Sequence, residues 1–443
     1  MNKFIQNIRN IFSIEDLRIR IINTLGFLII FRLGSYVVLP GVNPAAINNE
    51  NTQTGFLGIV NTFSGGAFSN VSIFALGIMP YITASIVLQL LTFAVPYFQK
   101  LSKEGESGRK KINQYTRILT IGICAFQSVT YIATYVKPEM IIPGMDSVFY
   151  YAARTIILVS GTMFCMWLGE KITDKGIGNG ISLLIMVGII SRLPHALFIE
   201  AHTKGMKGAL PFIIELIALF FIVVLVVAIT QAIRQIPVQY AKQVVGNKVY
   251  GGQRQYIPLK LIAAGVMPII FAQSIMVLPP MIASFYGESS ELASSIGTAF
   301  ADFTSWQYNV LLSVMIILFT FFYTALSVNP KSISDDMKRN GGFIPGVKPG
   351  DQTSEFIDNI LSKITLPGAL FLALISILPA LASLAGITRE FAYFYGGTSL
   401  LIIVGVVLDT LQQIESYLLM SRYEGMMKSG RIKGRSQAAV IAS

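Results

Sequence analysis

The sequence predicts an all-α integral membrane protein with ten transmembrane helices. Only 13% of its 443 residues are charged, 53% are hydrophobic, and the mean hydropathy is +0.62. Soluble domains carry about 25% charged residues, so this composition excludes a large soluble protein. A membrane-spanning helix needs roughly 20 mostly apolar residues. Ten segments meet that requirement: 21–39, 71–97, 118–136, 147–169, 177–199, 211–230, 261–285, 307–328, 364–385 and 394–411.

The ten segments differ in how clearly they qualify as spans. Residues 212–229 are the clearest, because Glu215, near the outer end, is their only charge. Arg32 and Arg154 interrupt the first and fourth spans, and we expect them to pair with helix ends or lipid headgroups. Residues 1–20 mix charged and apolar side chains, which predicts an amphipathic helix on the cytosolic membrane surface and no cleavable signal peptide.

Lysine and arginine are unequally divided between the two sides of the membrane. With the N-terminus in the cytosol, the cytosolic segments carry 27 of these residues and the opposite loops carry 5. Positive residues concentrate on the cytosolic side of membrane proteins, so we expect both termini in the cytosol. An even number of spans agrees with this orientation. The net charge of +11 is therefore mainly a topology signal and not a mark of nucleic-acid binding.

An uncharged run of 49 residues, 51–99, is longer than one span can use. Its first part, 61–70, is small, polar and rich in glycine. Non-helical backbone is tolerated at membrane depth only where protein buries it or where it lines a cavity. We therefore predict a short re-entrant piece at 61–70, with the span beginning near Val71. An external loop is the alternative that composition leaves open.

Glycine and proline break several spans, as is typical of helices around a transport pathway. The interrupting residues are Gly77, Pro80, Gly176, Gly178, Gly180, Gly265, Pro268, Pro279, Pro280, Gly396 and Gly397. Close packing through small residues is the alternative at any single position. The spans contain no set of acidic relay residues and the chain has no phosphate-binding loop, which argues against an ion-coupled carrier or a nucleotide-driven pump.

Isoleucines recur in the broken spans at helical spacing. Ile78 and Ile82 lie four residues apart, as do Ile181 and Ile185, so each pair occupies one helix face. An apolar constriction can close a wide pore by dewetting. Ordinary core or lipid-facing packing is the alternative that this spacing leaves open.

Two long loops face the cytosol in this topology. Loop 231–260 carries five Lys and Arg residues and no acid, and its alternating Ile236 and Val238 predict a short strand or hairpin. Loop 329–363 contains six Gly and Pro residues at 340–350, which predicts an extended and exposed tip. Basic, structured loop tips that face the cytosol suit a large acidic partner, and simple topology-setting with lipid contact is the alternative.

Cysteine and histidine usage predicts neither a metal centre nor catalysis. Cys124 and Cys165 lie in apolar stretches and are expected to pack as small hydrophobic residues. His195 and His202 fall in an outer loop, where we expect them on the surface. We therefore expect no cofactor and no enzymatic activity. An intramembrane enzyme would need a nucleophile–base pair or a metal cluster.

Several long motifs are more specific than these patterns. They are residues 61–69 (NTFSGGAFS), 72–82 (SIFALGIMPYI), 103–109 (KEGESGR), 161–170 (GTMFCMWLGE), 176–182 (GIGNGIS), 321–325 (FFYTA) and 396–401 (GGTSLL). In these motifs and their order, the chain resembles the SecY/Sec61-alpha family, the channel subunits of the Sec protein translocase, over nearly its full length.

The resemblance implies a protein-conducting channel of ten helices in two pseudo-symmetric five-helix halves. The halves would be 21–200 and 201–415, preceded by the cytosolic helix 1–20 and followed by a cytosolic tail at 416–443. The re-entrant piece would be a plug helix. Unfolded, signal-bearing polypeptides would cross the membrane through the channel, and transmembrane segments would leave it sideways into lipid. A secondary transporter of a small solute is the competing class, and it predicts a polar binding site at the midplane.

The resemblance also implies roles for individual residues. The pore ring would be Ile78, Ile82, Ile181, Ile185, Ile270 and Ile402. The plug would include Phe63, Ser64, Gly65, Gly66, Ala67 and Phe68. The lateral gate would include Thr83, Gln89, Gln127 and Ser274. The surface for the SecA motor ATPase or the ribosome would include Arg234, Lys242, Lys248, Arg254, Lys338, Arg339 and Lys348.

Two positions in the long loops depart from the family pattern. Lys348 stands where an arginine is frequent, and Gln235 replaces the second member of a basic pair that begins at Arg234. The implied partners are SecE-like and SecG-like small membrane subunits, SecA, the ribosome, signal-bearing precursor polypeptides and membrane lipids. The implied location is the bacterial inner membrane.

Overall fold

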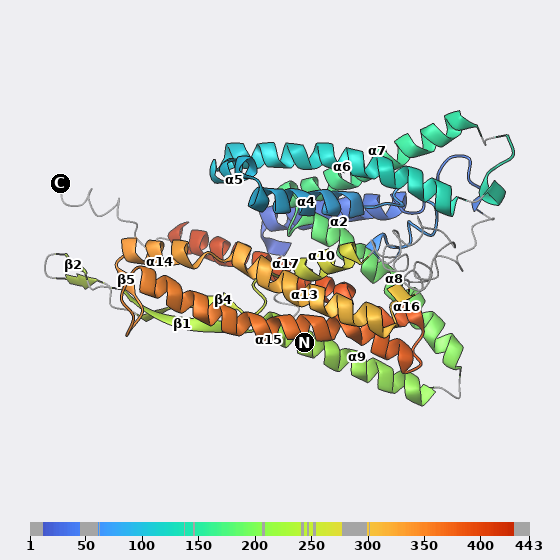
Figure 1. The fold of residues 1–443 in the computed structure, drawn as a ribbon. Coiled ribbons are helices and arrows are strands. Elements are labelled where there is room, and N and C mark those ends of the chain that lie inside the picture. Colours follow the sequence, from blue (N-terminus) through green and yellow to red (C-terminus); the bar gives the residue numbers. More distant parts are fainter. Residues whose placement is uncertain are drawn as a thin grey trace. The chain divides into compact units, whose positions relative to one another are not determined.

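The computed structural model (Figure 1) is built almost entirely of long helices. It describes residues 12–44, 61, 63–136, 138–144, 147–205, 209–240, 243–245, 248–250, 254–276, 299–300 and 302–428. The chain divides into two units. Unit 1 is Met1–Thr52, Val60–Arg192 and Val406–Ser443, and unit 2 is Gln53–Ile59 with Leu193–Gly405. Most of the predicted amphipathic N-terminal helix, residues 1–11, lies outside the described residues.

Unit 1 is a helical bundle in which α6 packs against α4 and α7, and α2 packs against α7. Its elements are α2 (Glu15–Gly34), α4 (Met79–Ala94), α5 (Pro96–Lys103), α6 (Glu106–Tyr135), η3 (Pro138–Met140), α7 (Val148–Lys175), the first part of α8 (Gly180–Lys204) and the last part of α17 (Gly397–Lys428). Cys124 and Cys165 are buried and unoxidised, which confirms their predicted packing role.

Unit 2 combines helices with a small antiparallel sheet. Its helices are the remainder of α8, α9 (Ala209–Thr230), α10 (Met267–Ile275), α13 (Trp306–Ser327), α14 (Pro330–Arg339), α15 (Asp351–Leu384), α16 (Arg389–Ala392) and the first part of α17. Its strands are β1 (Ile233–Tyr240), β2 (Gln243–Val245), β3 (Lys248–Tyr250), β4 (Arg254–Lys260) and β5 (Gly342–Phe343). Helix α13 packs against α10 and α15.

Helical structure occurs at each of the ten predicted spans. Among the described residues, seven helices are long and apolar enough to cross a membrane, or eight if the bent pair α4–α5 counts as one span. Helix α2 does not meet this criterion for a membrane span, because Arg18, Arg20 and Arg32 interrupt its apolar run. Helix α10 has nine described residues, and the predicted span continues outside the described part of the chain. The fold is that of a multi-pass membrane protein, and the count of ten stays a prediction.

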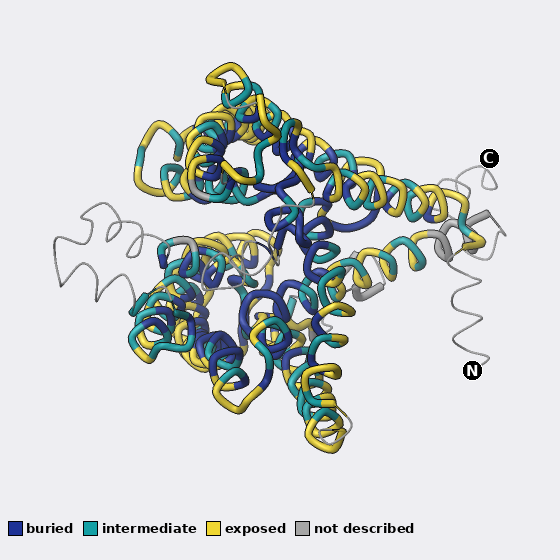
Figure 2. Tube along the Cα trace, turned by 90° about the vertical axis from the view of Figure 1, so that its right-hand side faces the viewer, coloured by how far each residue is buried: buried dark blue, intermediate teal, exposed yellow. Residues whose placement is uncertain are grey.

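Apolar side chains on the outer faces of the helices agree with a lipid environment. Figure 2 shows exposed residues along the helices and buried residues gathered within each unit. Helix α9 is the extreme case, because Val226 is its only buried residue while Phe220 and Phe221 are exposed. A soluble protein would not expose such a face, whereas lipid tails cover it without cost.

Several helices differ from the predicted spans in where they begin, bend or end. The span expected near Val71 begins at Met79, because Val71 and Gly77 take left-handed backbone angles and Pro80 favours a helix start. The same span bends by 98° between α4 and α5, at the residue preceding Pro96. Helix α8 continues to Lys204, so the residues expected in an outer loop, Arg192, His195 and His202, lie on a helix.

The two long loops, 231–260 and 329–363, pack together, which neither pattern predicted. The hairpin expected in loop 231–260 is confirmed: β1 pairs antiparallel with β4, with Ile236 opposite Ile257. Strand β5, from the other loop, pairs along β1, with Tyr240 opposite Gly342. A shared core joins the sheet to α14 and α15; it contains Ile236, Val238, Leu259, Met337, Ile344, Ile357 and Leu361.

The tip of loop 329–363 is mostly exposed, as predicted, but Gly342 and Ile344 within it are buried. Ile344 is 3% exposed within the shared core, while Phe343 beside it points outward. Glycine and proline keep residues 340–350 out of a helix, but they do not prevent one apolar side chain from packing inward.

The shared core predicts the effect of a mutation on local stability, and this effect does not depend on the function of the protein. Replacing Ile344 with Asp should release the tip from the sheet, because an unpaired charge would be buried among apolar side chains. We expect cleavage of the intact protein between 340 and 350 to become about tenfold faster under limited proteolysis. The control is Phe343→Asp on the exposed neighbour. Equal protection in the two variants would contradict the packing described here.

Candidate functional site

The predicted plug segment, residues 61 and 63–70, is folded into the interior of unit 1. Asn61 and Phe63 are helical and 64–70 form successive turns, in place of a continuous plug helix. Asn61 accepts hydrogen bonds from the backbone N–H groups of Gly66, at 2.9 Å, and Ser69, at 3.1 Å. Every described residue from 63 to 69 is buried. An exposed external loop, the alternative left open by composition, does not fit this burial.

Side chains from three helices hold the plug segment. The Nη1 atom of Arg32 on α2 donates to the Gly65 carbonyl oxygen at 2.6 Å. Arg192 on α8 donates from Nη2 to the Ser69 hydroxyl at 3.1 Å. Tyr131 on α6 donates to the Phe68 carbonyl oxygen at 2.7 Å. Charge-assisted hydrogen bonds are stronger than neutral ones, so the two arginines should contribute most.

Close packing complements these hydrogen bonds. The Phe68 ring makes edge contacts with the rings of Tyr131 and Tyr135, with centroids 4.8 and 5.0 Å apart. A Cβ atom on Gly188 of α8 would lie 2.5 Å from the Phe63 carbonyl oxygen. The absence of a side chain at Gly188 therefore allows the plug segment to lie directly against α8.

Three of the predicted ring isoleucines face the plug segment. Ile78, Ile82 and Ile185 line a cavity together with Phe63 and Ser64, and the cavity has only about 10 Å³ of space. This is close to the smallest space that admits a single water molecule, roughly 10–15 Å³. An apolar cavity of this size holds no continuous water path.

The other three ring positions lie elsewhere. Ile181 packs against Gly169 of α7, where a Cβ atom would approach it to 2.9 Å. In unit 2, Ile270 is half-buried on α10, and Ile402 is 3% exposed on α17. The six isoleucines are thus divided between the two units, and their closure into one ring stays a prediction.

The predicted gate residues lie on three helices. Thr83 and Gln89 are half-buried on α4; Thr83 donates to the Met79 carbonyl oxygen at 3.1 Å, and Gln89 donates to the Ser85 hydroxyl at 3.4 Å. Gln127 is half-buried on α6. Ser274 lies on α10, and its side chain is outside the described part.

The predicted basic positions lie on the elements around the shared core of loops 231–260 and 329–363. Arg234 is exposed on β1, Lys338 and Arg339 are exposed in the last turn of α14, and Lys348 is exposed after β5. Lys248 lies on β3 and Arg254 begins β4, but their side chains are outside the described part. Lys242 lies outside the described residues. The four described side chains are all exposed on unit 2, on elements around this core, and we refer to these four residues as the basic surface.

The charges within spans have protein partners. Arg154 is buried and donates to the carbonyl oxygens of Pro40, at 3.2 Å, and Gly41, at 3.4 Å. The carboxylates of Glu200 and Glu215 both pair with Lys204, and Thr388 also donates to Glu200. For Arg154, pairing with lipid headgroups is therefore wrong, because its guanidinium is inside the protein.

Sequence patterns did not reveal three plug contacts, those of Arg32, Arg192 and Tyr131; Arg32 was expected to pair with helix ends or lipid headgroups. Arg192 was counted with an outer loop, although an isolated arginine near the end of an apolar segment is itself a signal of a buried partner. Tyr131 gave no such signal, because tyrosine is common in apolar helices near the membrane surface.

Comparison with known proteins identifies the family. The SecY family model matches residues 72–411. The chain belongs to the SecY family. The protein translocase subunit SecY of Streptomyces scabiei is 42% identical over 431 residues, which cover 94% of this chain and 98% of the relative. SecY proteins are translocase channels and not enzymes, so membership also decides against a small-solute transporter.

Solved structures agree at the level of the fold. One described as a protein-conducting channel superposes with a TM-score of 0.59 at 17% identity, covering 90% of this chain and 92% of the other. Sec61 in a canine ribosome–channel complex superposes with a TM-score of 0.56 at 16% identity and the same coverage. The SecY fold thus extends over nearly all of this chain.

Proposed function

We propose that this SecY-family chain is the channel through which unfolded, signal-bearing polypeptides cross the bacterial inner membrane. The observation that carries the proposal is the contact in unit 1 between the buried plug segment and Ile78, Ile82 and Ile185. A plug beneath an apolar constriction blocks water and ions without any charged gate. Both elements can move aside for a polypeptide, because hydrogen bonds and packing, and not a covalent cross-link, hold the described plug residues in place.

The six isoleucines act together as an apolar seal in this proposal. In the resting state the plug segment fills the space below them. An arriving polypeptide displaces the plug, and the isoleucines close around the chain and limit ion leak. A sufficiently apolar segment leaves sideways into lipid, because lipid solvates it better than the aqueous pore does. Thr83, Gln89, Gln127 and Ser274 would line the gate through which it leaves.

Partner proteins would supply the driving force for transport, and small membrane subunits would hold the two halves of the channel together. We assign the basic surface of Arg234, Lys338, Arg339 and Lys348 to SecA or the ribosome, because exposed basic residues attract large acidic partners. SecE-like and SecG-like subunits would cover part of the apolar exterior. The excess of Lys and Arg in loops 231–260 and 329–363 supports cytosolic termini.

Reconstitution tests the function directly. The chain should be placed in vesicles with SecE-like and SecG-like subunits, and supplied with SecA, ATP and a precursor that carries a signal sequence. We expect the precursor to become protected from external protease, and a precursor lacking its signal to stay accessible. Failure of protection with active SecA would contradict the proposal.

Charge reversal tests the partner surface. The double variant Arg339→Glu with Lys348→Glu should slow SecA-driven transport about tenfold at low salt, because electrostatic steering raises association rates. The matched control reverses Lys331 and Lys363, which are exposed on the same loop. Rates should be measured at rising salt, where screening should narrow the difference. Equal rates for the two double variants would remove Arg339 and Lys348 from the contact.

A further inference from the structure

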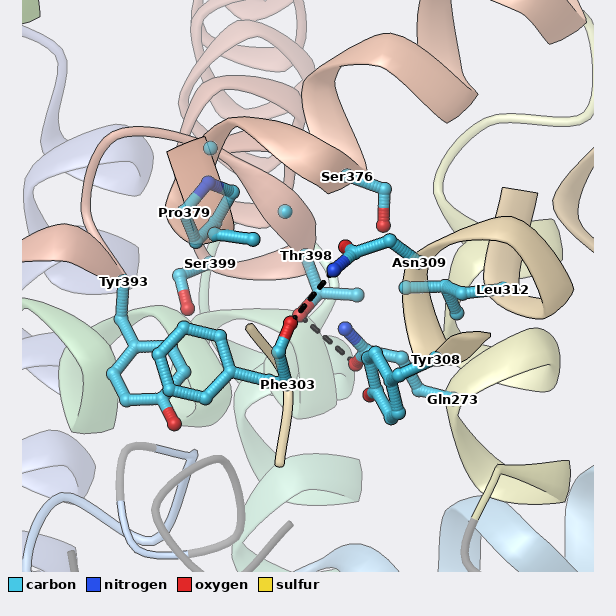
Figure 3. Close-up of a pocket in the computed structure, with 13 residues that line it drawn as sticks. Gln273, Phe303, Tyr308, Asn309, Leu312, Ser376, Pro379, Tyr393, Thr398 and Ser399 are labelled. Atoms are coloured by element: carbon cyan, nitrogen blue, oxygen red, sulfur yellow. Dashed lines mark hydrogen bonds between the residues drawn. The ribbon is translucent and has the colours of Figure 1, made fainter. Parts of the chain in front are cut away.

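A cavity with several polar side chains in its lining lies inside unit 2. Figure 3 shows it between α10, α13, α15 and the start of α17. The polar side chains in its lining include Gln273, Asn309, Ser376 and Thr398, and its space is about 30 Å³. That space exceeds the roughly 10–15 Å³ that one water molecule needs, so the cavity has room for at least one.

The hydroxyl of Ser376 is the unexplained group in this cavity. Ser376 is 6% exposed, and its Oγ atom is buried with no hydrogen-bond partner among the described residues. In Figure 3 the hydroxyl points into the cavity, on the side where Asn309 and Thr398 lie. An unpaired buried hydroxyl is costly, so a native protein normally supplies it with a partner.

The neighbouring side chains retain hydrogen-bonding capacity. Asn309 donates both of its amide hydrogens to backbone carbonyls, of Phe303 at 2.9 Å and Ser305 at 2.8 Å, and these bonds leave its Oδ1 acceptor unused. Thr398 donates to Oε1 of Gln273 at 3.1 Å, a bond that does not involve the amino group of Gln273. A water molecule needs two to four polar partners, and this cavity provides them.

We propose that the cavity binds one ordered water molecule, with Ser376 as its principal ligand and Asn309 and Gln273 as further partners. The water completes a polar cluster that already connects α10 to α17 through the Gln273–Thr398 hydrogen bond. Gln273 lies one turn after Ile270, and Thr398 lies one turn before Ile402. The cluster therefore braces the two helices that carry the ring isoleucines of this unit; only this last consequence rests on the proposed function.

The sign of a stability change tests the water site. If the cavity is hydrated, Ser376→Val expels the water and removes that partner from the Asn309 Oδ1 atom and the Gln273 amino group, so the thermal unfolding midpoint should fall by about 2–4 °C and that of Ser376→Ala by about half as much. If the cavity is dry, both changes remove an unpaired hydroxyl and should raise the midpoint. Ser128→Ala is the control, because Ser128 is buried with its hydroxyl donating to the Cys124 carbonyl oxygen.

An experimental density map of the wild-type protein at about 2 Å resolution gives a second measurement, which does not depend on how any variant folds. Density for one water beside the Ser376 Oγ atom supports the proposal; an empty cavity, or a raised midpoint in both variants, overturns it. Ion leak across vesicles that contain the Ser376→Val variant tests separately whether the polar cluster braces α10 and α17. A lowered midpoint with unchanged leak would retain the water site and count against the pore ring.

Discussion

Replacing Ile402 with Asn should open the resting channel. Ile402 is 3% exposed on α17, so an amide at this position would be buried without a partner in the closed state and hydrated in the open one. That burial costs about 1–3 kcal/mol, which corresponds to a roughly 5- to 150-fold shift toward the open state. We expect a higher ion leak and transport of precursors whose signal sequences are defective. Ile82→Asn should act in the same direction from the other unit.

The control for this change is Ile402→Leu, which keeps the volume and the apolar surface. Ion conductance of vesicles and transport of a signal-defective precursor should be measured on the same preparations. Unchanged leak and unchanged signal selectivity in both Asn variants would show that the isoleucines do not form the seal. A parallel loss of stability in the Leu control would instead indicate a packing effect.

Replacing Gly188 with Ala should displace the plug segment. The new methyl group would meet the Phe63 carbonyl oxygen at 2.5 Å, which is closer than real Cβ contacts, so either α8 or the segment must move. The segment is the weaker side, because turns and a few side-chain bonds hold it. We expect a raised ion leak, and at least tenfold faster modification of a cysteine placed at Ala67 by a membrane-impermeant maleimide.

Gly122→Ala is the matched control for this experiment. Gly122 lies in helix α6, and a Cβ atom there would meet no atom within 4 Å. The substitution should therefore leave the plug in place and stabilise α6 by up to about 1 kcal/mol, since alanine favours helices over glycine. Cys124 and Cys165 are buried and should not react with the probe. Equal modification rates in the two backgrounds would contradict the plug position described here.

The helical fold was predictable because the signal is local. Some 20 apolar residues define a span wherever it packs, and this rule located helices such as α9 and α13. Helix ends were less predictable. Helices α6, α15 and α17 extend well past their apolar segments, into stretches whose polar residues hide the continuation from a hydropathy criterion. The start of α4 depended on left-handed backbone at Val71, which composition does not reveal.

The candidate site was predictable only in part, since most of its contacts join distant segments. Spacing brought Ile78 and Ile82 to one helix face, but nothing local distinguished Ile270 or Ile402, and their roles came from family resemblance. The bonds from Arg32 and Arg192 to the plug segment connect residues 33 and 123 positions apart. The pairing of β5 with β1 is likewise long-range, so two loops that were considered separately form one surface.

The pairing of β1 with β5 limits when this sheet can be completed during synthesis of the chain. Strand β1 ends at Tyr240, and its partner β5 begins at Gly342, with α9 already made and α10 and α13 still to come. At 5–20 residues per second, the ribosome needs roughly 5–20 s to make the intervening chain. During that interval Ile236 and Val238 lack part of their core. A half-made chain thus cannot display the complete basic surface, which exists only after Lys348 and the rest of loop 329–363 have been made.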